Sequence, residues 1–253
     1  MAAEAAHSLG HDVRILSKKR KSEMFGAQYL HQPIPGMTNG DPIEVSYRLT
    51  GSISGYRQKV YGPDYSGPVS PDEYGTETNH LAWDIRQTYG ALWQKFGFFV
   101  EHVDFKTYPV AEAIKDTDPE FVISSIPAPL LCQHRDEHSF MDQIVYSIGD
   151  APERGIFCPI DCRKSTVLCN GLDEVSWYRV ANVFGHSTAE WPASRRPPYE
   201  GVAEVRKPLK TTCNCLPNVM RVGRYGKWSK GVLSHTAYIE TCEALTNPQL
   251  ALF

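Results

Sequence analysis

The opening of the chain combines a helical pattern with an extended one. Residues 2–9 are strong helix formers, and Gly10 stands where a glycine commonly ends a helix. Residues 11–16 then place apolar side chains at alternate positions, which predicts a short strand. The usual partner of such a helix and strand is a preceding strand and loop, as in a βαβ unit. The sequence shows no such strand, so we expect an internal start codon, a truncation or a variant without it.

Alternation in the next region predicts a hairpin, and helical spacing predicts a helix after it. Residues 45–49 and 56–61 alternate polar and apolar side chains and have glycines between them, which is typical of two antiparallel strands. Residues 77–96 carry apolar side chains at helical spacing, and Gly97 is expected to end that helix.

The second half of the chain contains mostly short apolar runs, which predict strands. The clearest is 119–127, an apolar run bounded by prolines. Further strands are expected at 98–103, 156–160, 165–169, 175–185, 202–205 and 219–223, with a helical turn at 109–115. The last strand is expected to lead through a glycine turn into a helix from about 230 to 245.

Composition narrows the class of protein. The 253 residues are 42% hydrophobic and 22% charged, with a formal net charge of −3, which fits a folded domain and gives no sign of nucleic-acid binding. No apolar run approaches the roughly 18 residues that span a bilayer, and the opening residues do not resemble a signal peptide. We therefore expect a cytoplasmic protein that acts on a small molecule, with no nucleic-acid or membrane partner; its seven cysteines are expected to be reduced thiols. The oligomeric state is left open.

Three segments in order resemble the glutathione-reductase-type superfamily of FAD-binding proteins, in particular its amine oxidase and UDP-galactopyranose mutase branch. Residues 2–16 resemble the family's first helix, which ends in Gly-His-x-Val and a second strand. Residues 120–127 are similar to its late strand, Asp-x-Val-Ile-x-Thr-x-Pro. Residues 221–233 resemble its closing strand, glycine turn and helix.

The resemblance implies an α/β fold with an incomplete Rossmann-type FAD-binding domain and an inserted substrate domain that contains a mixed or antiparallel sheet. The FAD-binding part would comprise 1–40, 98–150 and 206–253, and the substrate-binding part 41–97 and 151–205.

The resemblance also implies FAD as cofactor and a flavin-dependent oxidoreductase or mutase as activity. A glycine turn at a helix N-terminus exposes backbone N–H groups to an anionic or electron-rich group of the cofactor. An ordinary strand-to-helix turn is the alternative interpretation. The residues expected to bind the cofactor are Ser17, Lys18, Gln28, Gly223, Arg224, Tyr225, Gly226 and Leu233.

Two departures from the family pattern favour an alternative function. The G-x-G-x-x-G loop that holds the pyrophosphate is missing. Ser17 replaces the acid that usually binds the ribose, and the following Lys18, Lys19 and Arg20 are more typical of a 2′-phosphate site, or of a solvated turn. The alternative is a cofactor-free binding or regulatory protein that retains the flavoprotein fold, which leaves enzymatic activity undecided.

Candidates for chemistry beside the cofactor are few. His235 on the last helix is a candidate acid or base because histidine titrates near neutral pH, and Gln28 is a second candidate. Arg179 and its neighbour Tyr178 are expected to bind the substrate, with Arg179 facing an anionic group. Each of these is also compatible with a packing role.

Cysteines and histidines recur in the second half of the chain without the spacing of a zinc site. Structural zinc usually uses two close pairs such as C-x₂-C, so we expect buried thiols and assign no metal. A zinc-stabilised interaction protein is the less favoured alternative, and a redox role near the cofactor is a further one for Cys213 and Cys215. The residues concerned are Cys132, His134, His138, Cys158, Cys162, Cys213 and Cys215.

Overall fold

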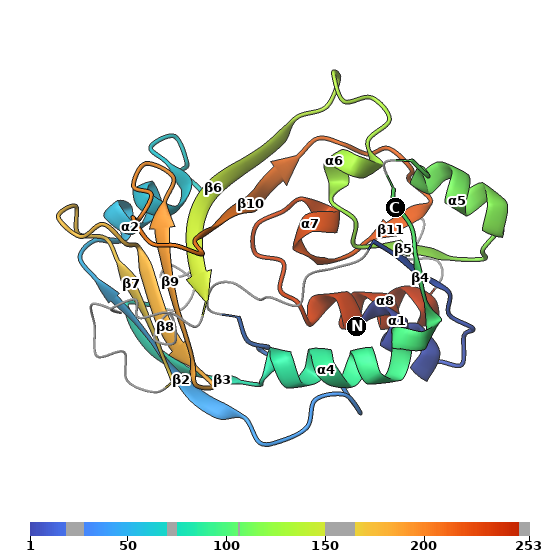
Figure 1. The fold of residues 1–253 in the computed structure, drawn as a ribbon, viewed down its shortest axis with the longest axis horizontal. Helices are drawn as coiled ribbons and strands as arrows, with labels where there is room; N and C mark the ends of the chain where they lie inside the picture. The colour runs from blue at the N-terminus through green and yellow to red at the C-terminus, as the bar shows by residue number, and fades with distance from the viewer. Residues whose placement is uncertain (19–27, 70–74, 106, 150–164, 248–253) are drawn as a thin grey trace.

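The structure, a computed structural model, describes residues 1–18, 28–69, 75–105, 107–149 and 165–247. It is a mixed α/β fold. A large mixed sheet occupies one side, and helices with two small parallel ribbons occupy the other (Figure 1). The strand predicted at 156–160 lies outside the described residues.

The large sheet has seven strands in the order β10-β6-β9-β8-β7-β2-β3. Neighbouring strands are antiparallel except for β2 and β7, which run parallel, so the sheet is mixed. The strands are β2 (Ile43–Thr50), β3 (Glu77–Ala82), β6 (Phe140–Gly149), β7 (Thr166–Asn170), β8 (Arg179–Val183), β9 (His186–Pro192) and β10 (Ala203–Thr211).

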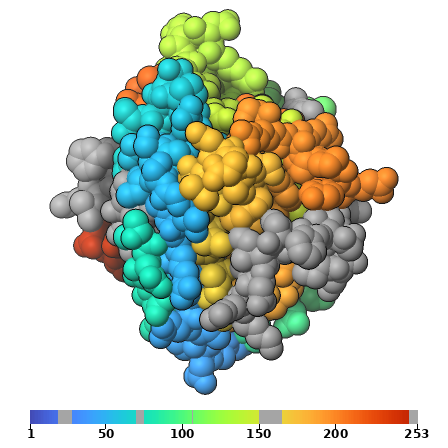
Figure 2. All heavy atoms as spheres, turned by 90° about the vertical axis from the view of Figure 1, so that its left-hand side faces the viewer, coloured from blue at the N-terminus to red at the C-terminus, as the bar shows by residue number. Residues whose placement is uncertain are grey.

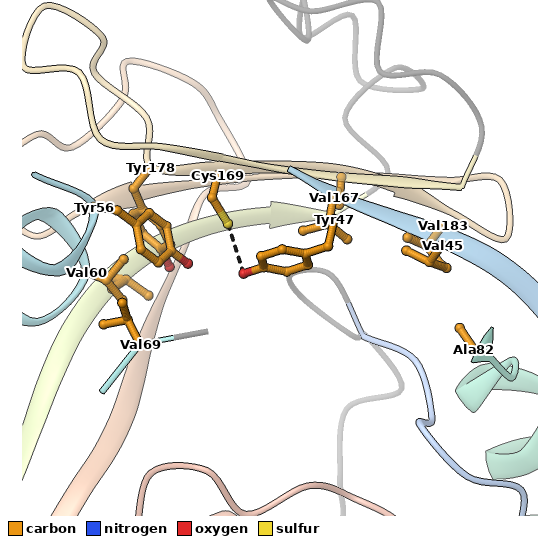
Figure 3. Close-up of a cluster of buried hydrophobic side chains, with 12 residues drawn as sticks. Val45, Tyr47, Tyr56, Val60, Val69, Ala82, Val167, Cys169, Tyr178 and Val183 are labelled. Carbon is orange, nitrogen blue, oxygen red and sulfur yellow. Dashed lines mark hydrogen bonds between the residues drawn. The ribbon is translucent and has the colours of Figure 1, made fainter. Parts of the chain in front are cut away.

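A core of valines and tyrosines packs on one face of this sheet. Val45, Val167 and Tyr178 are fully buried or nearly so. Figure 3 shows Tyr47 beside Cys169, whose thiol donates a hydrogen bond of 3.0 Å to the tyrosine hydroxyl. The core takes residues from strands that are distant in the chain, such as Val45 of β2 and Val183 of β8, so it holds the sheet together as one unit.

Residues 53–61 form helix α2 (Ile53–Tyr61), and the hairpin predicted for 45–49 and 56–61 is wrong in its second strand. Tyr56 and Val60 lie one helical turn apart and are both buried against the sheet. Ser52 caps the helix by accepting the backbone N–H of Gly55 at 2.9 Å. The six residues 56–61 satisfy both periodicities, and the cap and the tertiary contact select the helix.

The helix predicted for 77–96 is shorter than expected, because its first third is strand β3. β3 pairs antiparallel with β2 along its whole length, which places it at the edge of the sheet. Asp84 then begins helix α4 (Ile85–Phe96) by accepting the backbone N–H of Arg86 at 2.8 Å. A short 3₁₀ turn, η1 (Gly97–Phe99), follows.

The other half contains two parallel two-stranded ribbons. β1 (Ile15–Ser17) pairs with β4 (Val100–His102), and β5 (Val122–Ser124) pairs with β11 (Val219–Arg221). All four strands were predicted, although each is shorter than expected. We expected 13–16 and 221–233 to meet in one layered sheet; the structure places them in separate ribbons.

Helices surround these ribbons. α1 packs against α8, and Lys95 of α4 forms an ion pair of 2.7 Å with the buried Glu4 of α1. α1 and the turn at 109–115 were predicted from the sequence. The helices not yet given are α1 (Ala2–Ser8), α5 (Val110–Thr117), α6 (Ala128–Leu131), α7 (Gly223–Lys227) and α8 (Thr236–Thr246).

Two strands of the large sheet, β6 and β9, were missed because polar residues interrupt their apolar pattern. Glu190 lies in the middle of β9 and is buried, although charged residues are rarely buried without a partner. β6 and part of β10 come from 98–150 and 206–253, the segments assigned to the cofactor part, so those segments also build the large sheet.

Close backbone contact joins the start of α2 to the end of β7. Figure 2 shows the blue and cyan segment of β2 and α2 beside the gold segment around β7. A Cβ added to Gly171 would lie 2.0 Å from the backbone oxygen of Ser52, so this approach requires glycine. Among the described residues, no helix has the length and apolar character needed to cross a membrane.

Candidate functional site

A cavity of about 2490 Å³ lies between the large sheet and the two ribbons. Pockets for one small molecule typically measure roughly 300–1,000 Å³, so this space can hold a larger ligand or two molecules. Its wall includes Ile15 of β1, Ile123 of β5 and Val205 of β10. Both ribbons and the large sheet therefore contribute to the wall of this one cavity.

Three buried charged residues form the sheet side of this cavity. Arg179 of β8 lies directly opposite Glu190 of β9 and donates Nε–H to its carboxylate. Lys207 of β10 donates to the same carboxylate at 2.9 Å, and to the hydroxyl of Tyr178 at 2.6 Å. Tyr178 in turn donates to Glu190 at 2.9 Å. All three charged residues line the cavity.

This network keeps an excess of positive charge at the cavity wall. Burial alone would favour a protonated Glu190, but Arg179 and Lys207 outweigh it and hold the pKa of this carboxyl well below its ordinary value. Burial lowers the pKa of Lys207 to about 8, against the attraction of Glu190. Two cations therefore face one carboxylate at neutral pH, and the surplus charge suits an anionic ligand.

The opposite wall contains the predicted glycine turn. Gly223 has φ of 70° and begins α7, and a Cβ at this position would meet no protein atom within 4 Å. Arg224, Tyr225 and Leu233 line the cavity with it.

The helix expected directly after this turn is interrupted. α7 has five residues, and the eleven-residue α8 begins only at Thr236. A helix as short as α7 adds little dipole potential, so the dipole argument applies to α8 instead. Leu233 and Ser234, just ahead of α8, line the cavity, so the N-terminal end of the longer helix adjoins it.

The predicted cofactor residues near β1 also reach the cavity. Ser17 ends β1, Lys18 follows it, and both line the cavity. Gln28 lines it from the segment that leads to Leu30. Lys19 and Arg20, the rest of the predicted basic cluster, lie outside the described residues.

Three predicted site residues do not line the cavity. Gly226 packs on β5, because a Cβ there would lie 2.7 Å from the backbone oxygen of Ser124. Tyr178 is buried behind Arg179. His235 is buried at the start of α8; burial lowers its pKa, and its Nδ1 has no hydrogen-bond partner among the described residues.

A histidine cluster beside the cavity was missed. The rings of His31 and His80 stack with centroids 5.2 Å apart, and His235 lies 6.2 Å from His31. Tyr29 hydrogen-bonds His80 at 2.7 Å. Burial, then the neighbouring His80 and His235, lowers the pKa of His31 to about 4. Only the fold brings these residues together, so no local sequence signal could have revealed the cluster.

Glu190 and Lys207 were also missed. Opposite charges on two neighbouring strands indicate a cross-strand pair. To use this signal one must know the register that places Arg179 opposite Glu190. The strand β9 itself had not been predicted, so that signal could not be used.

A second group of side chains lies outside the cavity wall. Cys132, His138, Cys213 and Cys215 place their potential ligand atoms within 4.8 Å of one another. The sequence spacing had not predicted a metal site. The fold brings the pair Cys132 and His138 to the pair Cys213 and Cys215 from a distant segment. Cys158 and Cys162 lie outside the described residues.

Comparison with protein-family models found no family that matches the chain, and comparison with curated proteins found no match.

Proposed function

We propose that the cavity binds FAD and that the protein is an FAD-dependent oxidoreductase-like protein that acts on a small anionic substrate. One observation carries the proposal: a single cavity is lined by the end of β1, by the glycine turn at Gly223 and by the charged network of the sheet. These are the places where the resemblance expects the adenosine side, the flavin side and the substrate.

The residues present fit such a cofactor. Gly223 leaves open space where its Cβ would be, so a ligand can approach the backbone closely. The Nε of Arg224 and the Oγ of Ser147 are buried and have no hydrogen-bond partner in the described part of the chain, and both residues line the cavity. A polar ligand would supply the missing partners.

The ribbons support a Rossmann-type arrangement around the cofactor. β1 and β5 each have one partner strand among the described residues, and both line the cavity. A Rossmann-type sheet would have a further parallel strand and its glycine loop between them. In the described ranges the two ribbons are separate sheets, so the Rossmann-type arrangement is part of the proposal.

The sheet side supports an anionic substrate. Arg179 and Lys207 both line the cavity. In the network described above, both form their ion pair with the same carboxylate, that of Glu190. A bound flavin would supply the electron or hydride chemistry. The two cations would hold a carboxylate or phosphate of the substrate, and the surrounding buried core would limit access of water.

The second candidate is a cofactor-free binding or regulatory protein with the same fold. It is favoured by the absence of G-x-G-x-x-G from the sequence, because that loop provides most of the backbone contacts to a pyrophosphate. In this case the cavity would take an anionic small molecule without flavin.

Absorbance of the purified chain near the visible flavin bands, followed by titration with FAD, tests the first candidate. We expect either bound flavin or binding of added FAD with a change in flavin fluorescence. A folded protein that neither contains nor binds FAD, but is stabilised by anionic metabolites, would replace the proposal with the second candidate.

A matched pair of glycine variants locates the bound cofactor. Gly223→Ala and Gly185→Ala both force alanine into a left-handed conformation with no protein atom within 4 Å of the new Cβ, so both carry similar strain. Only Gly223 lines the cavity. We expect Gly223→Ala to weaken FAD binding by about tenfold or more, a loss of about 1.4 kcal/mol. Equal affinities of the two variants would contradict cofactor binding at this turn.

A further inference from the structure

The group of Cys132, His138, Cys213 and Cys215 is assembled by the paired ends of β6 and β10. Phe140 lies opposite Thr211 in this antiparallel pair. Ser139 and Thr212 continue the pairing, because the N–H of Thr212 donates to the carbonyl of Ser139 at 3.2 Å. His138 precedes this point and Cys213 follows it, so the strand register brings the two side chains together.

The other two residues enter from short turns. Cys132 immediately follows α6, and Cys215 lies two residues beyond Cys213. The two turns therefore bring Cys132 and Cys215 to the same place as His138 and Cys213.

Three of the six distances among the ligand atoms are close to the edges of a single tetrahedron, and all six are within 4.8 Å. Tetrahedral zinc with Zn–S near 2.3 Å and Zn–N near 2.0–2.1 Å places its sulfur ligands about 3.8 Å apart and its sulfur and nitrogen ligands about 3.6 Å apart. The Sγ atoms of Cys132 and Cys215 are 4.0 Å apart. His138 Nδ1 lies 3.3 Å from Cys132 Sγ and 3.7 Å from Cys215 Sγ.

Arg221 of β11 provides a positive charge beside the group. Its Nη2 lies 3.5 Å from the sulfur of Cys213 and donates to the carbonyl of Cys215 at 2.6 Å. Its Nη1 donates to the carbonyl of Cys213 at 3.0 Å. Three thiolates and a neutral histidine around a divalent ion carry a net charge of about −1, and a neighbouring guanidinium offsets such a charge.

We propose that Cys132, His138, Cys213 and Cys215 bind one zinc ion as a structural Cys₃His site. The ion would join the end of the large sheet, where β6 and β10 pair, to α6 and to the ribbon of β5 and β11. All four ligands come from protein side chains, so the site is closed and serves stability rather than catalysis.

The same geometry does not favour a disulfide or an iron–sulfur cluster, the two other common roles of clustered cysteines. A disulfide requires sulfur atoms about 2.05 Å apart. In the described ranges five cysteines are free thiols, and Cys132, Cys213 and Cys215 are among them. Thiolate-rich tetrahedral sites select zinc or iron–sulfur clusters. Four ligand atoms within 4.8 Å fit around one ion, whereas a cluster of several irons needs its ligands spread over more than one metal atom.

Metal analysis of the full chain, purified without a histidine tag and dialysed, tests the proposal. We expect about one zinc ion per chain. Cys132→Ser and Cys215→Ser should each remove most of the bound zinc. Cys242→Ser is the matched control, because Cys242 lies on α8, apart from the four ligands, and is also partly buried; it should leave the zinc content unchanged.

A variant that keeps the ligand count guards against loss of folding. His138→Cys should retain zinc, and after exchange with Co²⁺ its thiolate-to-cobalt absorption should exceed that of the unchanged chain. Removing zinc from the unchanged chain with a chelator should lower the Tm, and adding zinc should restore it.

Several results would overturn the proposal. The first is a purified chain that contains no zinc and whose Tm does not respond to added zinc; the second is iron in place of zinc. The third is a disulfide among Cys132, Cys213 and Cys215, detected by non-reducing mass spectrometry. The fourth is full zinc content in both serine variants. The readouts do not involve flavin, so they are independent of the function proposed above.

Discussion

The seven-stranded sheet and the ribbon half differ in how their strands are completed. In the sheet, five strands have a partner on both sides, and two of the three buried core clusters pack on it. In the ribbon half, each of the four short strands has one partner within the described ranges, and the cavity lies between the ribbons. The sheet is therefore stabilised by its own core, whereas in the ribbon half we expect bound ligands to contribute a larger share of the stability.

This contrast separates the expected effects of substitutions. Changes in the sheet should lower the free energy of unfolding irrespective of ligands, because they disturb a packed core. Changes around the ribbons should act mainly on binding of cofactor or zinc, and on stability through that binding.

The largest effect is expected for Glu190→Gln. The substitution leaves Arg179 and Lys207 buried beside a neutral side chain, and breaking a buried ion pair in this way costs about 3–5 kcal/mol. Urea denaturation should report that loss. Glu204→Gln on the same sheet is the control; Glu204 is exposed, so its change should stay within about 0.5 kcal/mol.

The pH dependence of the same variant sharpens the assignment. The pKa of Glu190 is depressed in the folded chain, so its contribution is complete above the ordinary carboxyl pKa and is lost as the pH falls below it. Glu190→Gln should remove this acid-side loss. A variant as stable as the unchanged chain at pH 7 would show that the sheet does not depend on this network.

An intermediate effect is expected for Gly226→Ala in the ribbon half. Its Cβ would lie 2.7 Å from the backbone oxygen of Ser124, so α7 must shift away from β5, at about 1–3 kcal/mol. Gly90→Ala in the middle of α4 meets no atom within 4 Å and should raise stability by about 0.5–1 kcal/mol. Thermal unfolding of both variants measures the difference. A Gly226→Ala variant as stable as the unchanged chain, or more stable, would mean that the contact between α7 and β5 is not close.

The smallest effect is expected from the histidine cluster in mild acid. The folded pKa of His31, about 4, lies below the ordinary histidine value, so unfolded chains bind more protons as the pH falls. Stability should therefore fall from about pH 6.5 toward 4, by about 1 kcal/mol at pH 5 after allowance for solvent screening. His31→Gln should flatten this slope, while replacement of the exposed His11 should leave it intact. Identical slopes for both variants would remove His31 from the explanation.

Local signals predicted those elements whose ends are marked in the sequence. The helix before Gly10 and the strand between Pro119 and Pro127 were confirmed, because glycine readily adopts the positive φ that ends a helix and proline restricts φ wherever it occurs. Residues 56–61 and 77–82 were assigned to the wrong kind of element, since short segments fit two periodicities and only packing against β2 and the sheet core selects one.

The candidate site was predicted in parts. Ser17 and Gly223 were expected to bind the cofactor and Arg179 the substrate, and all three line the cavity. Glu190 and Lys207 were not expected, because their burial depends on strand register. Glu190 lies on a strand that was not predicted, and Lys207 comes from β10, which β6 separates from β9, so only the strand order brings the two together.

By itself, the sequence determined a mixed α/β chain, the turn at Gly223 and the apolar strands of both ribbons. Each of these features follows from the residue spacing and backbone preferences of a few neighbouring residues. Only the tertiary structure decided that Cys132 and His138 meet Cys213 and Cys215, and that Arg179 shares a carboxylate with Lys207. The physical reason is that Cys213 meets His138, and Lys207 meets Glu190, from elements that are separate in the chain, so the order and register of the whole sheet place them together.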